Sequence, residues 1–138
     1  MQDFKKLRVW QMSHALMLDI YRAADSFPRE ELYGLNRQLK DAAISVEANL
    51  AEGSCKPGDH EFRRFVSISL GSACEVESHL IAARDLKFLP AQEFERLNTA
   101  CQNVRRMLVG LLRRLSAPTE RPPRRRPRSR RPRLETRT

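Results

Sequence analysis

The sequence has few cysteines and no long apolar run, and both absences narrow the possible functions. Cys55, Cys74 and Cys101 are odd in number and far apart, which argues against a disulfide framework and against paired zinc ligands. We interpret Cys74 and Cys101 as small core residues. No apolar stretch approaches the ~20 residues needed to cross a bilayer, and the amino terminus lacks the apolar block of a secretion signal. We therefore expect a cytoplasmic protein with no role in a membrane.

Residue groupings typical of catalysis are also missing from the sequence. His14, His60 and His79 are isolated along the chain, and although His79 lies one turn from Glu75, a lone pair of this kind is more often a surface hydrogen bond. A di-metal helix bundle needs a Glu and a His three residues apart in two copies, whereas the spacing here is four and no second copy exists. We therefore predict a protein that is not an enzyme and has no metal or cofactor.

The charge and the proline content divide the chain into two parts. Residues 1–116 carry 17 basic and 15 acidic side chains, whereas residues 117–138 carry nine and two. Five of the eight prolines also lie in residues 117–138, where they remove amide donors and disfavour helix. With 138 residues and 41% hydrophobic content, the chain can form one core of ordinary size. We expect one folded domain over residues 1–116 and a disordered Arg/Pro-rich tail over residues 117–138.

Apolar residues recur at helical spacing in four stretches of the folded part. These stretches cover about residues 8–26, 35–53, 59–86 and 90–115. Pro28 stops the first, Gly53 is expected to end the second in the left-handed conformation, Asp59 to cap the third, and Pro90 to open the fourth. The short connections between long helices predict an all-α fold, an antiparallel up-and-down four-helix bundle.

Two polar or small positions inside these helices have predicted structural roles. Gly71 costs ~1 kcal/mol of helix propensity relative to alanine, so we expect a partner backbone to approach closely there. Asn49 lies one turn from Ser45 at the border of the apolar stripe, where we expect it to find partners on a neighbouring helix. We favour this structural role for Asn49 over a ligand contact.

The first helix has an apolar arc of roughly 180°, which is wider than a monomer core usually needs. The surplus contains Trp10, Met17 and Tyr21, and another subunit could cover it. A helix set deep within its own bundle would explain the same arc. Both interpretations stay open, and the first predicts an oligomer interface at these three residues.

Several short blocks of sequence, in this order and spacing, are similar to one known family. They are Phe4-Lys5-Lys6-Leu7, Val9-Trp10-Gln11, Phe27-Pro28, Glu31-Leu32-Tyr33-Gly34-Leu35, Gln38-Leu39, Asn49-Leu50-Ala51-Glu52-Gly53, Gly71-Ser72 and Glu75. The chain resembles the four-helix-bundle family of 23S rRNA intervening-sequence proteins, which is related to the accessory variability proteins of diversity-generating retroelements. The resemblance covers about residues 4–116 and leaves the tail out.

The resemblance implies a cytosolic homopentamer whose bundles pack into a barrel or funnel, with a role in nucleic-acid binding. Two positions depart from the family pattern: Asp41 stands where many relatives have a basic residue, and Glu47 where proline is common. The acidic Asp41 weakens any transfer of a basic nucleic-acid surface to the second helix. We therefore look for cationic surfaces elsewhere in the chain.

Arginines of the fourth helix and of the tail are the candidate nucleic-acid contacts, because each can meet a phosphate. They are Arg105, Arg106, Arg113, Arg114, Arg121, Arg124, Arg125, Arg126, Arg128, Arg130, Arg131 and Arg133. A solvated helix face and a solubilising tail without a binding role are the alternatives. A second hypothesis is a structural hub that presents its surfaces to a protein partner, without contact to RNA or DNA.

Overall fold

The computed structural model describes residues 2–115, which form four long helices and no strand. The helices are α1 (Arg8–Ala24), α2 (Leu35–Ser54), α3 (Asp59–Asp85) and α4 (Ala91–Arg114), with 3-10 turns η1 (Phe4–Lys6) and η2 (Arg29–Glu31). The predicted all-α class is thus confirmed for this part of the chain. The predicted tail over residues 117–138 lies outside the described residues, together with its eight candidate arginines.

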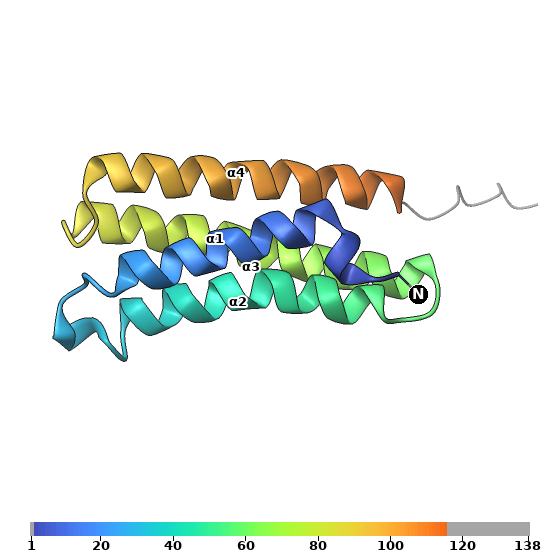
Figure 1. Cartoon of the computed structure of the whole chain (residues 1–138), viewed down its shortest axis with the longest axis horizontal. Helices are drawn as coiled ribbons and strands as arrows, with labels where there is room; N and C mark the ends of the chain where they lie inside the picture. Colours follow the sequence, from blue (N-terminus) through green and yellow to red (C-terminus); the bar gives the residue numbers. More distant parts are fainter. Residues whose placement is uncertain (1, 116–138) are drawn as a thin grey trace, which may run out of the picture.

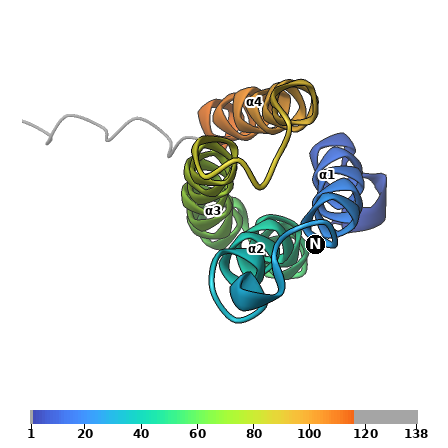
Figure 2. The same cartoon turned by 90° about the vertical axis from the view of Figure 1, so that its left-hand side faces the viewer.

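The helices lie side by side in sequence order (Figures 1 and 2), and the colours of Figure 1 advance in opposite directions along consecutive helices. Each helix contacts its two neighbours, and α4 closes the ring by packing against α1. The core runs along the whole length between them. Its fully buried large side chains include Ile20, Leu39, Leu50, Val66, Val76, Leu80, Leu97 and Leu108. These come from all four helices, so their apolar stripes face one common core.

Buried and half-buried polar side chains form hydrogen bonds between neighbouring helices. Asn36 at the start of α2 donates its amide to the carbonyl oxygen of Ala24 at the end of α1, 2.9 Å away. The Ser45 hydroxyl of α2 is 2.8 Å from the Ser72 hydroxyl of α3. Asn49 donates to the Ser45 carbonyl and hydroxyl, so its direct partner is on its own helix and its link to α3 passes through Ser45.

The connection between α2 and α3 differs from the prediction at two residues. Gly53 lies inside α2 and has no positive φ, so the expected left-handed ending is wrong. A Cβ on Gly53 would lie 2.6 Å from the Cβ of Phe65, so glycine is needed there for α2 and α3 to approach each other. Asp59 is the first residue of α3 rather than its cap, because Gly58 takes the capping position with a φ of 82°.

On the outer side of α3, two further predictions are not met within the described residues of this chain. Gly71 is exposed, and a Cβ there would have no atom of the described residues within 4 Å, so the expected close approach is not made within this chain. Cys74 is also exposed, because it is two residues from the buried Val76 and therefore lies about 200° around the helix from it. Cys101 is buried as predicted, and burial raises the pKa of its thiol to about 12.

Candidate nucleic-acid and oligomer interfaces

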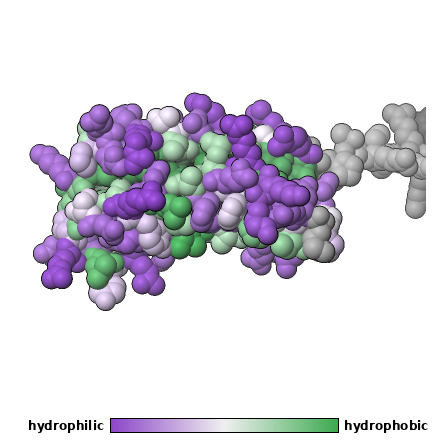
Figure 3. All heavy atoms as spheres, in the orientation of Figure 1, coloured by the Kyte–Doolittle hydropathy of each residue, from purple (hydrophilic) through white to green (hydrophobic). Residues whose placement is uncertain are grey.

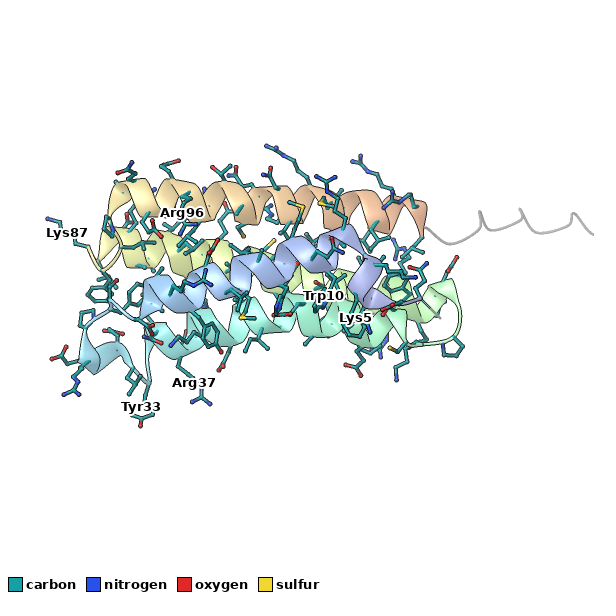
Figure 4. The ribbon with its side chains drawn as sticks, viewed as in Figure 1. Lys5, Trp10, Tyr33, Arg37, Lys87 and Arg96 are labelled. Atoms are coloured by element: carbon teal, nitrogen blue, oxygen red, sulfur yellow. The ribbon has the colours of Figure 1, made fainter. Side chains whose placement is uncertain are left out.

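Two arginines of α4 are held by carboxylates of neighbouring helices. Arg96 is paired with Glu93 on its own helix and donates to Asp19 of α1 at 3.1 Å; Figure 4 labels it on α4. Arg105 is paired with Glu77 of α3. The hydrogen bonds to these carboxylates raise the pKa of both guanidinium groups. Both arginines therefore join α4 to its neighbours. If Arg105 contacts a phosphate, as predicted, the phosphate has to compete with the Glu77 carboxylate for its guanidinium group.

Further along α4, three arginines point outward on the exposed side of the helix. Arg106, Arg113 and Arg114 are all exposed, and Arg106 donates to the side-chain oxygen of Asn103 at 3.5 Å. Arg105, Arg106 and Arg113 line a shallow groove over the middle and end of α4, together with Gln102, Val109 and Gly110. The described part of the predicted arginine row is thus brought onto one helix and leads to the end of the bundle.

The three predicted interface residues of α1 are half-buried against their own chain. The Trp10 ring stacks on His14, with centroids 5.0 Å apart, and meets Phe4 edge-on at 5.1 Å. His14 in turn is hydrogen-bonded through Nδ1 to Glu47 of α2 at 2.7 Å. The residue that departs from the family pattern at position 47 is therefore part of the contact between α1 and α2.

Met17 and Tyr21 continue the same side of α1. Met17 packs against the core, and the ammonium of Lys40 lies 4.8 Å above the Tyr21 ring. Lys40 and Glu47 of α2 both contact α1. Ile44 is four residues after Lys40 and three before Glu47, so it lies on the same side of α2. We call Trp10, His14, Met17, Tyr21 and Ile44 together the α1–α2 face.

Two residues of the α1–α2 face, His14 and Ile44, were not among the predicted interface residues, and Ile44 is the more exposed apolar one. It lies outside the narrow apolar stripe of α2, and 41% of it is exposed. The sequence did contain a signal for this residue: an isoleucine outside the core-facing stripe of an amphipathic helix indicates an exposed apolar contact. Figure 3 shows hydrophobic residues among hydrophilic ones in the middle of the face formed by α1 and its neighbours.

The described residues do not assemble a metal site. Within residues 2–115, no group of three or more His, Cys, Asp or Glu side chains is placed to hold an ion. In the same part of the chain, none of the helices combines the length and the apolar character that a bilayer crossing requires.

Comparisons with known proteins agree with this architecture. No match is found among curated proteins. A solved structure, a protein of unknown function from the S23 ribosomal protein family of Bacteroides thetaiotaomicron, superposes with a TM-score of 0.68 at 18% identity, covering 75% of this chain and 97% of that one. The sequence model of the 23S rRNA-intervening sequence proteins matches residues 5–110. The chain therefore belongs to the 23S rRNA-intervening sequence protein family.

Proposed function

We propose that this chain is a non-enzymatic, oligomeric four-helix-bundle protein that binds nucleic acid in the cytoplasm. The observation that carries the proposal is the row of exposed arginines on α4, Arg106, Arg113 and Arg114, which continues in sequence into a segment with nine more. Each guanidinium can bind a phosphate through two parallel hydrogen bonds. RNA is favoured over DNA because the family is named for an rRNA intervening sequence.

The proposed binding is electrostatic and has little sequence selectivity. Residues 117–138 contain no aromatic residue, so they offer no platform on which bases can stack. Arginine contacts to phosphates release counterions, so affinity falls steeply as salt rises. In an oligomer, several copies of the segment act together and can raise the apparent affinity ~100-fold where the geometry permits.

Removing residues 117–138 tests this proposal. Full-length and shortened protein are compared for binding to fluorescein-labelled RNA and DNA of one sequence at low salt. We expect the shortened protein to bind much more weakly, because nine arginines are lost with only two acidic residues. Equal binding by the two proteins would show that the segment contributes nothing.

The proposed assembly is a homopentamer, as in the family that the sequence resembles, with the α1–α2 face in its interface. Half-buried Trp10, Met17 and Tyr21 and the exposed Ile44 give this face the apolar area that an interface core needs. The variant Ile44→Glu tests the interface by placing a charge in it. The control is Leu86→Glu, at a side chain that is 56% exposed beyond the end of α3.

Light scattering at micromolar protein measures the mass of the wild type and of both variants. We expect a mass of several subunits for the wild type and Leu86→Glu, and a smaller mass for Ile44→Glu. A wild-type mass equal to one subunit refutes the oligomer, and an unchanged mass for Ile44→Glu removes this face from the interface.

A structural hub for a protein partner is the second candidate function. Leu32 and Tyr33, between α1 and α2, are 50% and 83% exposed, and tyrosine is enriched in protein interfaces. The variant Tyr33→Ala tests this surface. If the variant retains a protein partner of the wild type, the surface does not bind that partner. If the wild type also binds no nucleic acid, the first proposal fails as well.

A further inference from the structure

Three segments that are far apart in the sequence meet at one end of the bundle. The backbone amide of Gln2 donates to the carbonyl of Ser54, 2.8 Å away, which fixes the amino terminus beside the α2–α3 connection. Arg8 at the start of α1 and Arg114 at the end of α4 line one groove. Figure 1 shows the amino terminus, the α2–α3 connection and the end of α4 at the same end of the molecule.

This end holds the positive charge of the described chain. Residues 2–8, 52–64 and 113–115 carry eight basic and four acidic side chains. The rest of residues 2–115 carry nine basic and eleven acidic side chains. The net charge is therefore positive at this end and negative over the remainder of the described residues.

Most of the basic side chains at this end are exposed and lack an acidic partner within the described residues. We call six of them the basic end: Lys5, Lys6, Arg8, Lys56, Arg63 and Arg114. Elsewhere in residues 2–115 most basic side chains have a carboxylate within 4 Å, as Arg37 has Asp41 and Arg84 has Asp85. A cation without an ion-pair partner can bind a phosphate without first breaking a salt bridge.

We propose that the basic end is a second phosphate-binding surface, built by the bundle itself, that binds the backbone of a nucleic acid. The inference rests on the proposed nucleic-acid function. It adds five contacts, Lys5, Lys6, Arg8, Lys56 and Arg63, to Arg114 of the arginine row on α4. In the sequence, residues 116–138 follow directly after Arg114 and Leu115.

The surface fits a nucleic acid better than an anionic membrane. The exposed large hydrophobic side chains of residues 2–115 are Leu18, Leu32, Tyr33, Ile44, Ile68, Ile81 and Leu86, and none belongs to the segments that form this end. Membrane-surface binding normally combines basic residues with apolar ones that enter the acyl boundary. Trp10, the nearest candidate, is packed between Phe4 and His14.

Two charge-matched triple variants of the full-length protein test the proposal. The first replaces three members of the basic end: Lys5→Gln, Lys56→Gln and Arg63→Gln. The control replaces three exposed basic residues near the opposite end: Arg22→Gln, Arg29→Gln and Lys87→Gln. Both lose three charges and keep residues 117–138. Fluorescence of Trp10, the single tryptophan, and circular dichroism confirm that each is folded.

Binding to fluorescein-labelled poly(U) RNA is measured against salt concentration. Each lost phosphate contact lowers the slope of log K against log salt by ~0.7 to 0.9, so the basic-end variant should lose about two units of slope and ~10- to 100-fold in affinity at 0.1 M salt. The control should keep the wild-type slope.

Three outcomes would overturn the inference and can be told apart. Equal losses in both variants would show a general effect of net charge and leave the proposed function intact. Loss of binding to phosphatidylserine vesicles with unchanged RNA binding would assign the surface to membranes. Wild-type protein that does not bind RNA or DNA at low salt would refute the proposed function, and the inference with it.

Discussion

Substitution of Gly53 by alanine tests the contact that holds α2 against α3 beside the basic end. Gly53 is buried, and its added Cβ would lie 2.6 Å from the Cβ of Phe65 and 3.1 Å from Cδ2 of Phe62. The Cβ of Phe65 is fixed by its backbone and cannot turn away. Relief therefore requires α2 and α3 to move apart, which shifts Lys56 and Arg63 relative to each other.

The expected magnitude follows from two opposing effects of alanine. Helix propensity favours alanine over glycine by ~1 kcal/mol in a helix interior, and overpacking of a core costs ~1–3 kcal/mol. Gly71→Ala and Gly110→Ala are matched controls, because an added Cβ at either position has no described atom within 4 Å. The difference between Gly53→Ala and these controls removes the propensity term and leaves an overpacking cost of about 1–3 kcal/mol.

Urea denaturation at one fixed protein concentration measures these stabilities, because an oligomer's unfolding depends on concentration. Trp10 fluorescence and circular dichroism follow the transition. We expect Gly53→Ala to be less stable than the wild type and both controls to be as stable or more so. Equal stability of the three variants would refute the idea that close approach of α2 and α3 requires glycine at position 53.

Two further predictions concern buried polar groups. The variant Asn36→Ala should lower the free energy of unfolding by ~1–3 kcal/mol, because the carbonyl of Ala24 loses its hydrogen-bond donor; an unchanged urea midpoint would contradict this. Near pH 8, Cys55 and Cys74 should react with a thiol reagent while Cys101, whose pKa is raised to about 12 by burial, should stay protonated and react only after unfolding. Three rapidly reacting thiols in native protein would contradict it.

The positions of the helices could be predicted because prolines and glycines mark their ends. Pro28 separates α1 from α2, and Pro90 stands directly before α4, so the local chemistry agrees with the tertiary structure at these points. Gly53 shows where local reasoning fails. Glycine serves both as a helix end and as a site of close packing, and only the position of Phe65 on the next helix decides between the two.

The site was less predictable because charge pairing depends on contacts between helices. Arg96, Arg105 and Arg106 look alike in the sequence of α4, yet the first two meet Asp19 and Glu77 of other helices. The basic end was missed for the same reason, since its members come from both termini of the bundle and from its middle connection. The predicted up-and-down topology could have indicated the basic end, because it places the start of the first helix, the middle connection and the end of the fourth helix at one end of the bundle.

The salt dependence of RNA binding by the full-length protein tests the central claim most directly. We expect log K to fall linearly as log salt rises, with a steep slope that reflects many phosphate contacts. Absence of binding at low salt, or an affinity that does not change with salt, would contradict it.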